Sequence, residues 1–173
     1  HRQKVSKFVI TGGAGYLGSY MAIRLLQEGH IVKVIDKTPQ KSSLLPKDLN
    51  NENLSYLETD ICNSELDSHI IGFDTVIHFA ANTNAKIGFE KPQIDFHEGI
   101  YQTFKVLESM KQTNINKIIF SSSGTVYGDS EIIPTSENAN SLSPISIYGA
   151  AKLSSENLIN AFCNMYDMKS WIF

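Results

Sequence analysis

The sequence predicts an α/β fold with a doubly wound parallel β-sheet. Two observations indicate it: short apolar runs alternate with longer stretches of helical periodicity, and a glycine-rich turn joins the first run to the first helix. An apolar run, a helix and the next run make one βαβ unit, and repeated units build a parallel sheet. The 173 residues, of which 42% are hydrophobic, can bury one core, so we expect a single domain over 1–173.

The strands are expected where a short apolar run is bounded by polar or glycine residues. The run from Thr75 to Phe79 is a strong example, because apolar side chains fill most of it. The final run, Trp171 to Phe173, looks like a strand that has only begun. The expected strands are 7–11, 31–36, 54–58, 75–79, 117–121 and the start of a sixth at 170–173.

The helices are expected where apolar residues recur with a period of 3.6. They cover 16–28, 64–71, 93–113 and 147–166. Gly29 ends the first helix, whose apolar face carries Leu17, Met21, Leu25 and Leu26. The third has an apolar stripe that we expect to face the sheet, with a partner surface as the alternative, formed by Phe96, Ile100, Phe104, Leu107 and Met110.

Composition and charge exclude several classes of function. A net charge of −3 and a pI near 5.9, without a basic run, argue against binding to nucleic acid or to an anionic membrane. The apolar runs are far shorter than the roughly 18 residues that a membrane span needs, and no signal peptide is visible. Cys62 and Cys163 have no metal-site spacing. We therefore expect a cytoplasmic protein with reduced thiols and no metal.

A glycine-rich loop follows the first strand. Thr11 to Gly18 reads TGGAGYLG, which matches the G-x-G-x-x-G pattern of dinucleotide-binding turns. Between a strand and a helix, such a loop lets a pyrophosphate approach the backbone amides at the helix N-terminus. No Lys-Ser or Lys-Thr follows the glycines, so the loop is not that of a nucleotide-hydrolysing protein. The loop predicts a Rossmann-type domain.

Two carboxylates follow the second and third strands. Asp36 ends the second strand, where it can accept hydrogen bonds from the adenosine ribose and repel a 2′-phosphate. This favours NAD over NADP, although the neighbouring Lys37 weakens the inference, and a turn-forming role for Asp36 is the alternative. Asp60 and Ile61, after the third strand, are candidates for adenine contacts, and for Asp60 a capping role is nearly as plausible.

A tyrosine and a lysine four residues apart provide candidate acid/base chemistry. Tyr148 and Lys152 share one helix face, with their Cβ atoms roughly 5–6 Å apart, so the ammonium can lower the pKa of the phenol. Serine hydroxyls at the end of the fifth strand, Ser123 among them, stand upstream. The same spacing recurs at Tyr101 and Lys105 without such a strand end, and we interpret that copy as surface residues.

Together with the sequences HFAA at 78–81 and SSSGTVYG at 121–128, these motifs resemble the extended short-chain dehydrogenase/reductases. Within them the chain is most similar to the NAD-dependent sugar-nucleotide epimerase/dehydratase group, which includes UDP-glucose 4-epimerases. The resemblance implies catalytic roles for Ser123, Tyr148 and Lys152. It implies cofactor contacts from Gly12, Gly15, Tyr16, Leu17, Gly18, Asp36, Asp60, Ile61, Phe79, Ala80, Ala81, Ser121, Tyr148 and Lys152.

The implied reaction is transient hydride transfer to NAD while Tyr148 removes the proton of a sugar hydroxyl. The substrate would be a nucleotide sugar, namely a UDP-hexose. Dehydratases of this group have Asp-Glu after the catalytic hydroxyl, whereas this chain has Gly124 and Thr125, so epimerisation is favoured. Decarboxylation, oxidation of another alcohol and non-catalytic NAD binding remain open.

The chain departs from the group in three ways. Gly99 to Thr103 replaces the Asn-x-x-Gly-Thr pattern, so a cofactor-side amide is expected to be absent, with Glu98 as a possible substitute. Asn82 to Asn84 replaces the Gly-x-Lys of well-known 4-epimerases. The resemblance also implies a C-terminal substrate lobe, which we expect to be missing from these 173 residues, so we expect NAD binding with little or no sugar turnover. The resemblance further implies a homodimer through helices 93–113 and 147–166.

Overall fold

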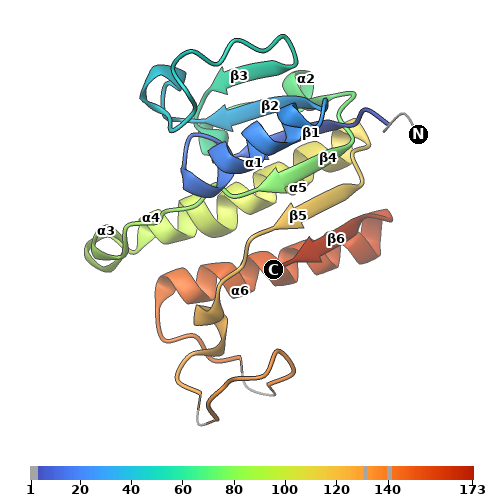
Figure 1. The fold of residues 1–173 in the computed structure, drawn as a ribbon. Coiled ribbons are helices and arrows are strands. Elements are labelled where there is room, and N and C mark those ends of the chain that lie inside the picture. Colours follow the sequence, from blue (N-terminus) through green and yellow to red (C-terminus); the bar gives the residue numbers. More distant parts are fainter. Residues whose placement is uncertain (1–3, 131, 140–141) are drawn as a thin grey trace.

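The protein was analysed as a computed structural model that describes residues 4–130, 132–139 and 142–173. One six-stranded parallel sheet runs through it in the order β3-β2-β1-β4-β5-β6 (Figure 1). The strands are β1 Lys7–Thr11, β2 Ile31–Asp36, β3 Leu54–Glu58, β4 Thr75–His78, β5 Lys117–Phe120 and β6 Lys169–Ile172. This is the order of a Rossmann-type doubly wound fold, as the sequence predicts.

The order of the strands reverses between β1 and β4, which lie side by side. Thr11 of β1 is in register with His78 of β4, so both strands end at the same level. The chain leaves β1 toward one edge of the sheet and leaves β4 toward the other. Such a switch point opens a crevice beyond the carboxyl ends of the strands, where ligands bind in this fold.

Helices cover both faces of the sheet. Helix α1 lies on one face, whereas α2, α5 and α6 pack on the other (Figure 1). The other helical segments are short and lie in the connections. The helices are α1 Tyr16–Gln27, η1 Gln40–Ser42, η2 Ile61–Asn63, α2 Asp67–Ile70, α3 Ala85–Glu90, α4 Gln93–Asp95, η3 Phe96–Tyr101, α5 Gln102–Thr113, η4 Gly124–Tyr127 and α6 Ile147–Tyr166.

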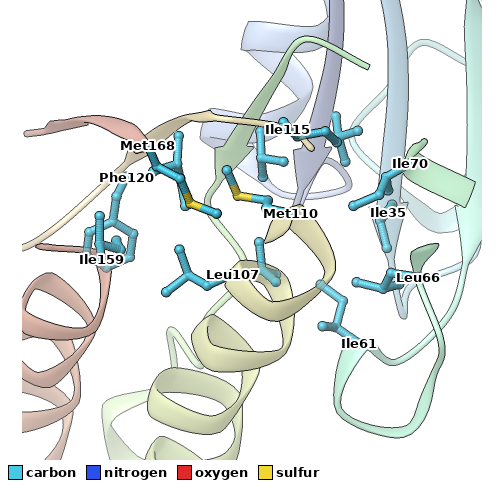
Figure 2. Packing of buried hydrophobic residues seen from close by; sticks show 14 residues of the cluster. Ile35, Ile61, Leu66, Ile70, Leu107, Met110, Ile115, Phe120, Ile159 and Met168 are labelled. Carbon is cyan, nitrogen blue, oxygen red and sulfur yellow. The ribbon is translucent and has the colours of Figure 1, made fainter. Parts of the chain in front are cut away.

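The larger core fills the space between the sheet and helices α5 and α6. Leu107 and Met110 of α5 and Ile159 of α6 are completely buried there, beside Phe120 of β5 (Figure 2). Burying a side chain of this size contributes roughly 1.5–3 kcal/mol. A smaller core under α1 contains Ala22, Leu26 and the inward residues of β1, β2 and β4. These two cores hold the ends of β1 and β4 in place.

The third expected helix differs from a regular α-helix. A π-helical turn, η3, interrupts 93–113 between the short α4 and the longer α5. The turn breaks the expected apolar stripe: Leu107 and Met110 are buried, but Phe96 is 50% and Phe104 37% exposed. The expectation that the stripe faces the sheet is therefore confirmed for Leu107 and Met110, whereas Phe96 and Phe104 remain exposed and the alternative of a partner surface stays open for them.

Other expectations need smaller corrections. The helix expected at 64–71 is reduced to α2, with the 3₁₀ turn η2 before it. Leu17 is 55% exposed, because α1 buries Gly18, Ala22 and Leu26 instead. The last run is a full strand, β6, paired with β5. Among the described residues, no helix is long and apolar enough to span a membrane, and both cysteines are free.

Candidate functional site

The glycine loop turns sharply between β1 and α1. Gly12 adopts a φ of +71°, a conformation that strongly favours glycine. A Cβ atom at Gly18 would lie 2.3 Å from the carbonyl oxygen of Gly12, so α1 can approach the loop only without a side chain there. Helix α1 begins directly after Gly15, which leaves its first backbone amides facing outward from the loop. The loop is therefore built to receive an anion.

One cavity of about 500 Å³ extends from the glycine loop to helix α6. Its lining includes every residue that the sequence assigned to the cofactor. From the loop come Gly12, Gly15, Tyr16, Leu17 and Gly18; from the strand ends and α6 come Asp36, Asp60, Ile61, Phe79, Ala80, Ala81, Ser121, Tyr148 and Lys152. Residues that are separated by more than a hundred positions in the chain thus share one surface.

Asp36 is held at the mouth of the cavity by two backbone amides. The amide of Ala14 donates to its Oδ2 at 3.0 Å, and the amide of Thr38 donates to its Oδ1 at 2.9 Å. Each carboxylate oxygen accepts more than one hydrogen bond, so both keep capacity for ligand hydroxyls. Asp36 therefore combines the turn-stabilising role with a position suited to ribose.

Asp60 has a structural role that the sequence left open. Its Oδ1 accepts from the amide of Cys62 at 3.0 Å, and its Oδ2 accepts from Nδ2 of Asn63 at 3.0 Å. Asp60 is thus the N-cap of η2, as the capping alternative predicts. Ile61 is buried in the core and also reaches the cavity.

Tyr148 and Lys152 lie at the start of α6, and Ser146 caps this helix by accepting from the amide of Gly149. The ammonium of Lys152 is buried, donates to the carbonyl of Ser121 at 2.8 Å and lies 5.7 Å from the Tyr148 ring centre. Burial lowers the pKa of Lys152 to about 8. The ammonium is thus oriented by the carbonyl of Ser121, just beyond β5, rather than by the phenol.

The pKa of Tyr148 differs from the expectation. Burial raises it above the usual value, and the interaction with Ser123 acts in the opposite direction. The expected lowering by Lys152 is not found. Ser123 lies at the N-cap of η4, where its Oγ accepts from the amide of Thr125 at 3.2 Å and from Oγ1 of Thr125 at 2.9 Å. Unlike Tyr148, Ser123 is not part of the lining of the 500 Å³ cavity.

A buried polar chain that the sequence did not suggest connects the loop to α6. His78 is 1% exposed and lies between the hydroxyls of Thr11, at 2.6 Å, and Thr103, at 3.0 Å. Oγ of Ser155 then donates to Oγ1 of Thr103 at 3.1 Å, and the amide of Ala80 donates to Oγ1 of Thr11. Burial lowers the pKa of His78 to about 3, so the imidazole is neutral.

Glu98 in the π-helical turn η3 and Gln102 at the start of α5 supply polar groups; the sequence suggests the first as a substitute, and it does not suggest the second. Glu98 and Gln102 both line the cavity. Nε2 of Gln102 donates to the carbonyls of Ala80 at 3.0 Å and of Glu98 at 2.9 Å. An amide is therefore present at the cavity wall, three positions after the expected one. Gly99 instead faces α6, where a Cβ atom would lie 2.8 Å from that of Ala151.

The second Tyr-x-x-x-Lys copy lies outside this cavity, as expected. Tyr101 is 38% exposed, and Lys105 pairs with Glu65 at 3.8 Å. Within the described part of the chain, no cluster of three or more histidine, cysteine, aspartate or glutamate residues could hold a metal ion.

Comparisons with known proteins agree with this geometry. The chain is 31% identical over 170 residues to UDP-glucose 4-epimerase of Corynebacterium glutamicum, covering 94% of this chain and 48% of that protein. UDP-N-acetylglucosamine 4-epimerase from Methanobrevibacter ruminantium superimposes with a TM-score of 0.88 at 29% identity, over 98% of this chain and 54% of that one. UDP-glucose 4-epimerase from Brucella ovis in complex with NAD superimposes with a TM-score of 0.86 at 25% identity, over 97% of this chain and 51% of that one.

The chain thus spans about half the length of the relatives it matches. The NAD dependent epimerase/dehydratase family matches residues 8–173, which include most of β1, the glycine loop, Tyr148 and Lys152. The match covers nearly the whole chain, and the strand order of the sheet is that of a Rossmann-type fold. The chain therefore belongs to the NAD dependent epimerase/dehydratase family.

Proposed function

We propose that this chain is the NAD-binding portion of a UDP-sugar 4-epimerase. The observation that carries the proposal is one cavity that runs from Asp36 at the end of β2, past the glycine loop after β1, to Tyr148 and Lys152 of α6. A dinucleotide is an elongated ligand that needs a ribose acceptor at one end, an anion site for the pyrophosphate in the middle and a catalytic group at the other end. The relatives that are named 4-epimerases of UDP-sugars support the choice of substrate class.

The residues present fit NAD. The loop has no Cβ atoms at Gly12, Gly15 and Gly18, so a pyrophosphate can approach the first amides of α1. Asp36 offers carboxylate oxygens, already fixed by two amides, to the adenosine ribose. At the other end, Lys152 donates toward Ser121 and has further N–H groups for the nicotinamide ribose. NAD, when bound, supplies the hydride acceptor.

In the proposed mechanism, Tyr148 moves the proton. Its phenolate accepts the proton of the sugar 4-hydroxyl as carbon 4 is oxidised. After the sugar ring has rotated to present its opposite face, the phenol returns the proton to the same oxygen as carbon 4 is reduced again. Burial alone raises the pKa of Tyr148, so nearby positive charge and the Ser123 interaction must favour the phenolate in the working complex. Ser123, at the N-cap of η4, is the proposed hydroxyl partner of the substrate.

Epimerisation fits this site better than dehydration. The residues after Ser123 are Gly124 and Thr125, which begin η4 and carry no carboxyl group. Loss of water from a sugar needs an acid and a base beyond the tyrosine. We therefore propose that the chain belongs to the epimerase branch of its family.

The test is conversion of UDP-galactose to UDP-glucose by the whole protein and by its Tyr148→Phe variant. We expect the variant to lose about 10²-fold or more in kcat, the size of a general acid/base contribution. Tyr101→Phe is the matched control, because Tyr101 has the same spacing to a lysine but lies outside the cavity. Equal loss in both variants, or none in Tyr148→Phe, would refute the mechanism. The chain 1–173 alone should bind NAD without turnover.

A further inference from the structure

Two residues with opposite consequences for cofactor choice stand next to each other at the cavity mouth. Asp36 disfavours a cofactor with a 2′-phosphate, because its carboxylate would face that group. Lys37 follows it and also lines the cavity. A free cation at this position would attract a 2′-phosphate, as arginine does in NADP-binding members of this fold. The preference therefore depends on what Lys37 is bound to.

Lys37 is paired with a carboxylate from a distant part of the chain. Its Nζ donates to Oε1 of Glu98, which lies 61 residues later in the π-helical turn η3. The Glu98 side chain is 24% exposed and the Lys37 side chain 61%, so only the carboxylate of the pair is partly shielded from water. The hydrogen bond with Glu98 is the largest influence that raises the pKa of Lys37, and the charges of Asp60 and Asp36 act in the same direction. One ammonium thus stands among three carboxylates.

The π-helical turn holds Glu98 in this position. The carbonyl of Glu98 accepts from Nε2 of Gln102 at 2.9 Å, and the same amide nitrogen donates to the carbonyl of Ala80, beyond the end of β4. Cys62 of η2 also contacts this turn, through a hydrogen bond from its Sγ to the carbonyl of His97 at 3.3 Å. Contacts on both sides of Glu98 therefore fix its backbone relative to the cavity.

We propose that Glu98 is a specificity-determining residue that keeps Lys37 from binding a 2′-phosphate and so selects NAD over NADP. The proposal rests on the proposed NAD-binding function. A 2′-phosphate would have to compete with Glu98 for the ammonium while it faces the carboxylates of Asp36 and Asp60. A ribose 2′-hydroxyl needs only an acceptor, which Asp36 supplies, and it leaves the Lys37–Glu98 pair intact.

The experiment measures the dissociation constants of NAD and NADP by isothermal titration calorimetry for the chain and for Glu98→Gln. Glutamine keeps the shape of Glu98 but removes its charge, so Lys37 becomes available to a phosphate. We expect the ratio of the NADP constant to the NAD constant to fall about tenfold, the size of one charge-assisted hydrogen bond. Thermal unfolding by circular dichroism verifies that the variant is folded.

Two further variants show which group is responsible. In Glu98→Gln combined with Lys37→Gln, the ratio should return to the original value, because no cation remains. Glu65→Gln is the matched control: Glu65 also pairs with a lysine, Lys105, but outside the cavity, and its removal should leave the ratio unchanged.

The outcomes separate this proposal from the proposed function. If the original chain binds NAD and Glu98→Gln leaves the ratio unchanged, the role of Glu98 is refuted and NAD binding stands. A tenfold gain that persists in the double variant refutes the part played by Lys37. If the original chain binds neither dinucleotide, or prefers NADP, the proposed function or its NAD assignment fails, and this proposal fails with it.

Discussion

At the residue scale, His78 shows how a buried ionisable group can serve the fold instead of the chemistry. Its two ring nitrogens are occupied by Thr11 and Thr103, and its ring stacks on Phe120 with 5.8 Å between centres. A neutral imidazole can donate with one nitrogen and accept with the other, which suits two hydroxyl partners. The residue therefore joins β1, β4, β5 and α5 just below the glycine loop.

We predict that acid destabilises the chain through His78. The pKa of His78 is about 3 in the folded state, against 6.5 for an ordinary histidine, so between these values the unfolded chain binds a proton that the folded chain does not. Stability from this group is therefore present above pH 6.5 and falls as the pH falls toward 3. At pH 5 the loss in the free energy of unfolding is about 2 kcal/mol.

Urea unfolding at pH 7 and pH 5 measures this loss. The decrease in the free energy of unfolding from pH 7 to pH 5 should be about 2 kcal/mol smaller in His78→Asn than in the original chain. His69→Asn, at an exposed position, is the control and should leave the difference between the two pH values unchanged. An equal loss in the original chain and in His78→Asn would contradict the prediction.

At the element scale, the glycine loop separates two uses of glycine within one turn. At Gly18 an added Cβ would meet backbone atoms of Gly12 and Gly13 closer than 3.0 Å. At Gly15 it would meet only the carbonyl oxygen of Gly12, at 3.5 Å, which is an ordinary contact. Gly18 is thus required by the fold, whereas Gly15 is expected to be required by the ligand.

The two alanine variants should differ accordingly. Gly18→Ala should lower the free energy of unfolding by about 1–3 kcal/mol, the usual cost of overpacking, because backbone must move. Gly15→Ala should unfold close to the original temperature but bind NAD at least about tenfold more weakly, since its Cβ would stand between the pyrophosphate and the amides. Thermal unfolding and calorimetry measure the two effects. Equal stability losses would contradict this separation.

The packing of η3 against α6 is close at Gly99. The Cβ atom of an alanine at 99 would lie 2.8 Å from Cβ of Ala151, well inside van der Waals contact. We predict that Gly99→Ala lowers the free energy of unfolding by about 1 kcal/mol or more, despite the better helix propensity of alanine. Adding Ala151→Gly should recover part of the loss of Gly99→Ala. If Gly99→Ala alone stabilises the chain, the contact does not limit packing.

At the scale of the whole molecule, helices α5 and α6 leave aromatic residues on their outer side. Phe104 of α5 stacks edge-on against Phe162 of α6 with 6.0 Å between ring centres, and Tyr166 lies 5.2 Å from Phe162. Phe104 is 37% and Met165 68% exposed. Apolar side chains gathered across two neighbouring helices are typical of an interface.

We predict that this surface forms a homodimer. Sedimentation velocity should give a dimer for the chain and a monomer for Phe104→Glu, because a charge would be buried without a partner. Ile71→Glu, at an apolar and more exposed position after α2, should remain dimeric. A monomeric chain at micromolar concentration, or dissociation by both changes, would contradict the prediction.

Much of the fold could be predicted from the sequence because it depends on local patterns. Strands β1, β2 and β3 and helix α6 have the expected bounds, since each is a run of suitable side chains with a clear start and end. The π-helical turn could not be predicted, because the apolar period continues through it. It forms where Gly99 meets Ala151 and Gln102 meets Ala80, and these contacts join residues far apart in the chain.

The sequence by itself determined the parallel sheet, the glycine loop, the carboxylate at the end of β2 and the Tyr148–Lys152 spacing, because short-range patterns specify each of them. Only the tertiary structure decided that Asp60 caps η2, that Lys152 donates to Ser121 and that Lys37 is paired with Glu98. The physical reason is that a side chain's charge and hydrogen bonds depend on what lies beside it in space, and the sheet order brings distant segments together at the switch point.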